Sequence, residues 1–433
     1  MLKAGFSRLD VTPPFGTDIA GYFYRRISDG ILDPLYLNAV AVGNGTDTLI
    51  LIAVDYIGIT HCYTTDIRNL IEERTGVPSD HIMISALHQH TSPCIDDPKS
   101  RPTTVDPIFY DVFKRKCADA AKMAIDDMSE ATLGTAAAET DEPIAFVRRY
   151  FLDDGTVVTN PRTVECPRLT SRCADADNTV RLLRFTRDGK NDIALVNFST
   201  HPDVIGGTKF SADWCGFVRK YVESDLIGVS CAFFTGTQGD SNHIDYFLPK
   251  EERGRGYEHS KFMGRTVANT VVSLWDKTDT RTDDTVSAKF KIIYSKTNDA
   301  GAEKYEECKR FIDDANAGKI DPPPHITELA YASRVINLRT APIFKPIPLT
   351  VFKLGDVVFV GFGGEAFTEY GKAARACAPD KFVVCAVCSN GYEGYFPTKK
   401  AFSEGGYEAS SSMFSPTLEQ EIVAALDDMI KNA

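Results

Sequence analysis

The chain has 433 residues, 43% of them hydrophobic and 25% charged, and a formal net charge of -12. This hydrophobic fraction predicts a folded protein with a sizeable core and excludes a disordered chain. Acidic and basic residues are interspersed without a basic stripe, so we expect a small-molecule substrate as the partner, and neither nucleic acid nor a membrane.

The first residues, MLKAGFSRLD, include Lys3, Arg8 and Asp10 and lack the apolar segment of a signal peptide. No later segment reaches the roughly 18 consecutive apolar residues that a membrane span needs. We therefore expect a cytoplasmic protein, whose eleven cysteines are reduced and mostly buried rather than paired in disulfides. The composition is compatible with a homo-oligomer.

Strands and helices are predicted in alternation along the chain. Runs rich in apolar and β-branched residues predict strands over 37–43, 48–56, 81–87, 192–200, 231–236, 286–295, 334–340, 348–355, 356–364 and 382–390. Apolar residues at helical spacing predict helices over 63–75, 108–128, 211–225, 257–276, 302–316, 365–377 and 416–431.

This alternation predicts an α/β fold, a single large domain over residues 1–433 with mixed β-sheets and surrounding helices. The paired runs near 37–55 and 348–362 predict hairpins, with turns at GNGTD and LGD. The charged segment 302–316 predicts an exposed helix, followed by a rigid connector at DPPPH.

Polar residues capable of chemistry follow directly where five of the strand-like runs end. The five sequences are HQHTSP, HPD, QGDSNH, EAF and NGYEGY. In an open α/β sheet, ligands bind in the crevice beyond the strand ends, because loops and helix N-termini converge there. If the five junctions share one edge, they form a site.

Two imidazoles and a carboxylate at these junctions, His88, His201 and Glu365, form a ligand set that suits Zn²⁺ and leaves a coordination position open. Each residue also has a plainer interpretation. His88 can lie in a solvent-facing loop, and His201 can end a strand in the extended conformation that Pro202 favours. Glu365 can complement the positive end of the helix predicted over 365–377.

The motifs at these junctions resemble those of the neutral/alkaline non-lysosomal ceramidase family, which are zinc-dependent amidases. The similarity begins at GFSRLDVT and the Gly21-Tyr22 pair, and continues through SALHQHTSP, NFSTH, the Gly239-Asp240 pair and the GGE that ends in Glu365. It ends with NGYEGY and GGYE, in which Tyr395 precedes Tyr407 by twelve positions, as two active-site tyrosines do in the family. The resemblance is scattered over nearly the whole chain and implies the fold of the ceramidase catalytic domain.

Carried over position by position, the resemblance implies that zinc is coordinated by His88, His201, Glu365 and Tyr395. It also implies pocket-lining roles for His90, Tyr407 and Arg148, with Arg149 as the competing choice for the arginine. We expect His90 to carry a proton to the leaving group, and Tyr407 and Arg148 to hold an oxyanion or a polar part of the substrate.

The sequence departs from the family at GDSNHID, where Asn242 stands in place of a serine that is important in ceramidase catalysis. Asp240 and His243 flank this position and are candidates for an acid or base, or for substrate binding together with Asn242; Asp240 can instead cap the turn. Tyr392 is a further candidate for substrate binding, or an ordinary surface aromatic residue. The ceramidases' following immunoglobulin-like domain and a membrane-docking segment are also not expected here.

These observations predict a zinc-dependent hydrolase of a small soluble substrate, most simply an amide other than ceramide. Two alternatives stay open: a hydrolase or lyase acting on a sugar, glycoside or cyclitol derivative, and an inactive metal-binding protein. Asp55, which ends the strand run 48–56, is either support for a ligand histidine or a loop carboxylate without a partner.

Overall fold

Two β-sheets form the centre of the molecule in the computed structural model, which describes residues 1–96, 106–298 and 302–433. The larger sheet has the order β18 (Val229–Thr235), β16 (Asp192–Phe198), β15 (Thr179–Arg187), β10 (Ser129–Glu139), β1 (Lys3–Asp10), β5 (Tyr36–Gly43), β6 (Thr48–Val54), β8 (Ile82–Ala86), with β20 (Asp279–Arg281) paired to β10. The smaller has the order β21 (Val286–Lys296), β22 (Phe344–Leu354), β23 (Val357–Phe362), β25 (Phe382–Ala386). Both sheets mix parallel and antiparallel pairs, which confirms the predicted mixed α/β fold.

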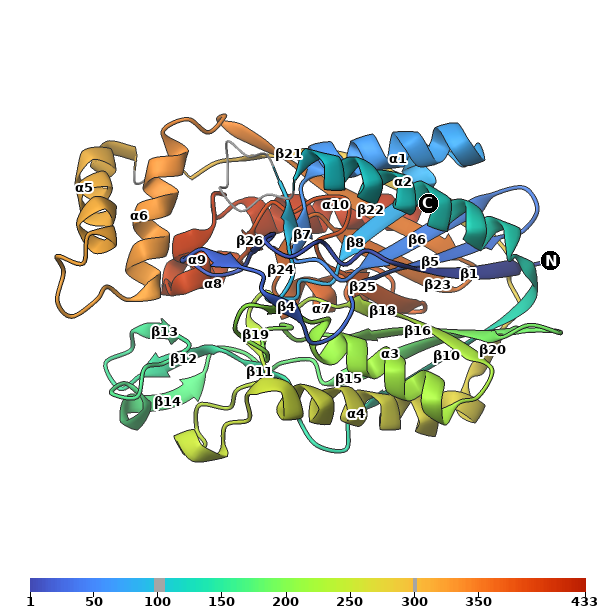
Figure 1. Cartoon of the computed structure of the whole chain (residues 1–433), viewed down its shortest axis with the longest axis horizontal. Coiled ribbons are helices and arrows are strands. Elements are labelled where there is room, and N and C mark those ends of the chain that lie inside the picture. The colour runs from blue at the N-terminus through green and yellow to red at the C-terminus, as the bar shows by residue number, and fades with distance from the viewer. Residues whose placement is uncertain (97–105, 299–301) are drawn as a thin grey trace.

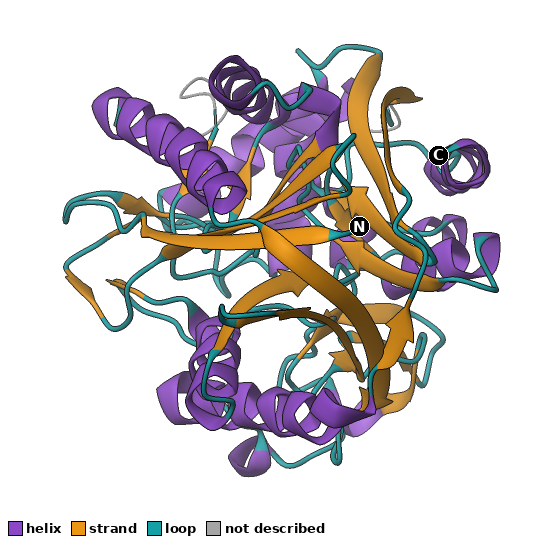
Figure 2. Cartoon of the chain, turned by 90° about the vertical axis from the view of Figure 1, so that its right-hand side faces the viewer, coloured by secondary structure: helices purple, strands orange, loops and turns teal. Residues whose placement is uncertain are grey.

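Helices cover the outer faces of the sheets, as Figures 1 and 2 show. One pair lies along one side of the larger sheet: α1 (His61–Thr75) and α2 (Pro107–Asp126). A second pair packs on the same face over β18, β15 and β10: α3 (Asp213–Asp225) and α4 (Gly256–Leu274). The smaller sheet is covered by α7 (Thr368–Cys377) and α10 (Leu418–Asn432). Among the described residues, no helix combines the length and the apolar character that crossing a bilayer requires.

Strand β5 shows why the sequence LNAVAVG is continuously apolar. Successive strand side chains point to opposite faces, and both faces of β5 are covered. Leu37, Ala39 and Ala41 belong to the core beneath α1 and α2, whereas Val40 and Val42 belong to the core shared with the smaller sheet. A strand buried on both faces lacks the polar alternation of a half-exposed strand.

Three parallel strand pairs bring their carboxyl ends to one region: β6 with β8, β16 with β18, and β23 with β25. Side chains join these ends. The Thr235 hydroxyl donates to the Leu87 carbonyl at 2.8 Å, and the Asn197 amide donates to the Cys385 carbonyl at 2.8 Å. The edge predicted to gather the five junctions is therefore built from both sheets.

The strand predicted over 334–340 is wrong, because most of these residues lie in α6 (Ile326–Leu338). His325 caps the start of this helix, and its side chain accepts from the Thr327 amide in a capping box. Val335 packs on the neighbouring α5 (Tyr305–Asn316) with its helix-spaced apolar neighbours. Short apolar runs do not separate strand from helix by periodicity alone, which explains the error.

Besides the three-residue β20, three strands of the larger sheet have no counterpart in the predicted elements: β1, β10 and β15. Their sequences, KAGFSRLD, SEATLGTAAAE and TVRLLRFTR, mix charged and small residues with apolar ones. Pairing along β10 and β15 runs over nine residues, from Ala131 opposite Arg187 to Glu139 opposite Thr179. Tertiary pairing thus imposes strands that composition does not reveal.

Candidate metal centre

His88 leaves strand β8 in a left-handed conformation, with φ of 75°. A residue with a side chain rarely adopts this conformation, and it is concentrated at functional sites. The strain is held by two hydrogen bonds: the His88 amide donates to the Tyr56 carbonyl at 2.9 Å, and ring Nδ1 donates to the Ile57 carbonyl at 2.8 Å. Since a carbonyl only accepts, Nδ1 carries the proton and Nε2 presents a lone pair.

Gln89 points away from the two histidines that flank it. Its amide donates to Asp55 Oδ1 at 3.0 Å, and Arg219 binds both oxygens of the same carboxylate at 2.9 and 2.6 Å. Asp55 therefore touches neither His88 nor His90 and has partners of its own, which neither sequence interpretation anticipated. This buried ion pair fixes the loop that carries both histidines.

His201 follows β16 and is oriented in the same way as His88. Its Nδ1 donates to the carbonyls of Gln238 at 2.8 Å and Ser241 at 2.9 Å, so its Nε2 is also a bare lone pair. Burial lowers the pKa of His201 to about 3, which keeps the ring neutral. The Gln238 and Ser241 carbonyls come from the loop after β18, which explains why that junction belongs to the site.

Glu365 and Tyr395 are register partners in a short parallel pair, β24 (Glu365–Ala366) and β26 (Tyr395–Phe396). The prediction that Glu365 heads a helix is wrong by three residues, because α7 begins at Thr368. Gly239 packs against this pair: a Cβ there would lie 2.4 Å from the Glu365 carbonyl oxygen, so a side chain is excluded. This close approach accounts for the glycine of the Gly239-Asp240 motif.

The Glu365 carboxylate faces both histidines in a way that hydrogen bonding does not explain. Its Oε2 lies 3.2 Å from His88 Nε2 and 3.3 Å from His201 Nε2, with all three side chains at most 3% exposed. The Glu365 oxygen thus faces two ring nitrogens whose protons lie on the far side of each ring, and among the described residues none of these three atoms has a hydrogen-bond partner.

A cation at the point between the three atoms removes this conflict. Two ligands each 2.0 to 2.1 Å from a tetrahedral zinc ion are separated by about 3.3 Å, which matches the observed spacings. The donor set of two neutral imidazoles and one carboxylate is the kind that zinc accepts. His90 is also within reach, because one nitrogen from each of His88, His90 and His201 lies within 4.8 Å of the other two. The residues present therefore fit a metal ion.

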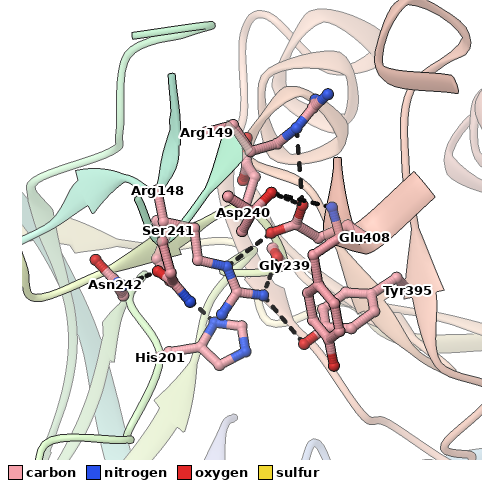
Figure 3. Close-up of polar contacts among 12 residues, drawn as sticks. Arg148, Arg149, His201, Gly239, Asp240, Ser241, Asn242, Tyr395 and Glu408 are labelled. Atoms are coloured by element: carbon pink, nitrogen blue, oxygen red, sulfur yellow. Dashed lines mark hydrogen bonds and ion pairs between the residues drawn. The ribbon is translucent and has the colours of Figure 1, made fainter. Parts of the chain in front are cut away.

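Arg148, Tyr395, Tyr407 and Glu408 form the wall of the site beside this cluster. Arg148 donates through Nη2 to Tyr395 Oη and the Gly239 carbonyl, each at 3.0 Å, and through Nε to Glu408 at 2.8 Å (Figure 3). The Tyr395 ring stacks on His201 with centroids 6.4 Å apart and meets the Tyr407 ring edge-on at 5.5 Å. Burial raises the pKa of Tyr407 to about 12 and that of Tyr395 well above its usual range.

The two arginines point in different directions. Arg148 lies between β11 (Phe146–Val147) and β12 (Arg149–Leu152), and Arg149 turns away from His201 and Tyr395 in Figure 3. Its guanidinium donates to the Gly405 carbonyl at 2.8 Å and pairs with Glu404 at 3.2 Å. The structure therefore brings Arg148 to the cluster and leaves Arg149 holding the loop before α9 (Tyr407–Ser411).

Asp240 and Asn242 are occupied by contacts within the fold. Asp240 Oδ1 accepts from the Thr368 amide and hydroxyl, each at 2.8 Å, and so anchors the start of α7. The Asn242 amide group donates to Asn160 at 2.8 Å, and its oxygen accepts from the Ile244 amide at 2.9 Å. Both side chains are thus engaged within the fold, and Asp240 caps the start of α7 rather than its own turn.

Tyr392 lies against the cluster, whereas His243 is buried beside His259. The Tyr392 ring meets the His88 ring edge-on with centroids 5.6 Å apart and is 9% exposed, so it is part of the buried wall rather than a surface aromatic residue. His243 is 6% exposed and has no hydrogen-bond partner for either ring nitrogen within the described part of the chain.

Three contributors to the site were missed from the sequence. Glu408 is fully buried between Arg148 and the Thr159 hydroxyl, at 2.8 Å from each. Tyr22 donates to Asp203 at 2.8 Å, beside His90. In the sequence these residues could have been found only from the motifs that contain them. Glu408 follows Tyr407 in GGYE, Tyr22 belongs to the Gly21-Tyr22 pair, and Asp203 ends HPD.

Comparison with known proteins gives a likeness of fold. No family model matches the sequence, and no curated protein matches it. Among solved structures, neutral ceramidase from Pseudomonas aeruginosa is similar with a TM-score of 0.76 at 14% identity, covering 99% of this chain and 74% of that one. A structure described as ceramidase complexed with C2 has a TM-score of 0.75 at 14% identity, with the same coverage. The chain has a neutral-ceramidase-like fold.

Proposed function

We propose that the chain is a zinc-dependent hydrolase that cleaves the C–N bond of a small soluble amide. The observation that carries the proposal is the placement of Glu365 Oε2 at 3.2 and 3.3 Å from the Nε2 atoms of two histidines, an arrangement that a shared metal ion would satisfy. The likeness of fold to neutral ceramidases supports amide hydrolysis in particular. The ligands would be His88, His201, Glu365 and Tyr395.

Zinc bound there supplies Lewis acidity, which activates water near neutral pH and polarises a carbonyl group. The protein groups do the rest. His90 would accept a proton from the attacking water and deliver it to the departing nitrogen. Hydrolysis adds OH to the acyl carbon and H to the nitrogen, and releases a carboxylic acid and an amine.

Arg148 and Tyr407 would stabilise the negative charge that develops on the acyl oxygen. Arg148 holds a positive charge within 3.0 Å of Tyr395 Oη, and the Tyr407 ring lies 5.5 Å from the Tyr395 ring. Preorganised donors in a site closed to water contribute strongly to such stabilisation, because they need no reorganisation as the charge forms. Glu408 keeps Arg148 in this orientation.

Metal analysis and a substrate panel test the proposal together. After dialysis, the wild-type protein should retain one zinc ion per chain, and His201→Ala should retain none. His81→Ala is the matched control, because His81 precedes β8 at the end opposite to His88. Zinc-dependent release of carboxylic acid from N-acyl compounds is expected. Normal zinc retention by His201→Ala would refute the ligand assignment, and turnover of glycosides alone would refute the amidase assignment.

A further inference from the structure

A second group of polar side chains lies beside His90, on segments other than those that hold Arg148. Asp203 follows His201 by two positions, and its Oδ1 accepts from the Tyr22 hydroxyl at 2.8 Å and lies 3.7 Å from His90 Nδ1. Its side chain is 33% exposed, so a ligand can reach it. Gly21 allows this arrangement, since a Cβ there would lie 2.7 Å from His90 Nδ1.

His243 extends the same group. It lies two positions after Ser241, whose carbonyl accepts from His201 Nδ1 at 2.9 Å, and the His259 ring lies at a centroid distance of 5.6 Å. Burial lowers the pKa of His243 to about 3, although Asp203 and the backbone of Gly254 oppose the shift. The ring is therefore neutral and presents one N–H donor and one lone pair.

Neither His90 nor His243 has a hydrogen-bond partner on its ring nitrogens among residues 1–96, 106–298 and 302–433, although each is at least nine-tenths buried. Buried polar groups in native proteins nearly always have partners, in the protein or in what it binds. Besides the His90 nitrogen that would act on the attacking water, the two imidazoles therefore have hydrogen-bonding capacity left for a ligand, and Asp203 adds further acceptor capacity.

The chemistry of these groups selects among possible occupants. An alkyl chain satisfies none of them, and an ammonium group donates to Asp203 but accepts nothing from an imidazole N–H. A hydroxyl group both donates and accepts, so neighbouring hydroxyls can satisfy all three side chains. The exposed ring of Phe23 would suit an apolar chain, but it meets the Tyr407 ring at 6.3 Å and so lies on the acyl side of the site.

From this arrangement we infer that the site binds a substrate with several hydroxyl groups, an N-acylated amino sugar or aminocyclitol, whose hydroxyls contact His90, His243 and Asp203. The inference rests on the proposed amide hydrolysis and names the side of the amide that the protein recognises. The hydroxylated portion is the amine released by hydrolysis, and the acyl group faces Arg148 and Tyr407.

Binding to matched acetamides tests the inference. The probes are N-acetylglucosamine, N-acetylgalactosamine and N-acetylmannosamine, compared with N-cyclohexylacetamide, which keeps the ring and the amide but has no hydroxyl. On the zinc-loaded protein, calorimetry should show at least one of the sugars binding ten times more tightly than N-cyclohexylacetamide. Equal or tighter binding of N-cyclohexylacetamide, or no binding of any sugar, would overturn the inference.

Variants of His243 test whether this residue causes the preference for hydroxylated acetamides. His243→Phe keeps an aromatic ring but removes both nitrogens, and should weaken sugar binding at least tenfold while zinc content and N-cyclohexylacetamide binding stay unchanged. His243→Asn keeps a hydrogen-bond donor and an acceptor and should restore part of the sugar affinity. If the Phe variant does not fold, the Asn variant alone tests the role of His243. An unchanged preference in both variants overturns the assignment. Amide hydrolysis without hydroxyl preference refutes this inference alone, whereas sugar binding without hydrolysis refutes the proposed function.

Discussion

The buried ion pair between Asp55 and Arg219 gives a prediction with two separable effects. Arg219 lies on α3 and is 4% exposed, while Asp55 is 0% exposed. Arg219→Met keeps most of the aliphatic volume but leaves the carboxylate with only the amides of Gln89 and Tyr36 as donors. Removing one partner of a buried pair costs about 3–5 kcal/mol. Urea denaturation should show a loss of this size in the free energy of unfolding.

The second effect is on the metal. Without Arg219, the Asp55 carboxylate is no longer held in position, so the hydrogen bond that Gln89 donates to it anchors the loop carrying His88 and His90 less firmly. Groups that support metal ligands typically change affinity by about 10- to 100-fold, so competition with a chelator should show zinc affinity reduced by at least tenfold. The double variant Asp55→Leu/Arg219→Met removes both charges and should regain stability, but not zinc affinity, because Gln89 then has no acceptor at position 55.

Arg74→Met is the control, because the pair between Arg74 and Asp119 is exposed on both sides and should contribute less than about 1 kcal/mol. If Arg219→Met costs no more than this control, the ion pair is not what stabilises the loop. Full recovery of zinc affinity in the double variant would contradict the role given to Gln89.

Three further outcomes are expected. Glu365→Gln should abolish zinc retention yet preserve or raise the melting temperature of the metal-free protein, because the new amide can donate to His88 Nε2; a lower melting temperature would contradict the lone-pair geometry. Because the pKa of His243 falls from 6.5 to about 3 on folding, the unfolded state binds the proton first as the pH drops. Stability measured by urea titration should therefore decline from pH 6.5 towards 3 by roughly 1 kcal/mol per pH unit, and His243→Asn should flatten this decline. Tyr407→Phe should lower kcat by about 10²–10³ with normal zinc content, if Tyr407 is an oxyanion donor, whereas Tyr395→Phe should weaken zinc binding.

Strand ends were the most informative feature of the sequence. The abrupt change from MISAL to HQHTSP marks where β8 ends, and the same signal located His201 after β16. It works because a strand buried on both faces must be apolar, so the first polar residues mark its exit from the core. The prediction that these junctions meet was correct in geometry for His88, His201 and Glu365.

Side-chain direction was not readable from the sequence. Arg148 and Arg149 are adjacent and chemically alike, but in the folded chain the Arg148 side chain contacts Tyr395 and the Arg149 side chain contacts Glu404. Asp240 and Asn242 have residue types suited to catalysis, but partners more than eighty positions away in sequence, Thr368 and Asn160, engage them.

The sequence by itself determined the alternation of strands and helices, the buried character of the central strands and the residue types available at their ends, because burial and periodicity are local properties of composition. Only the tertiary structure decided which of those residues share a site. Long-range contacts place two histidine lone pairs on one carboxylate oxygen, and the backbone carbonyls that orient the rings come from segments that sequence spacing does not relate to them.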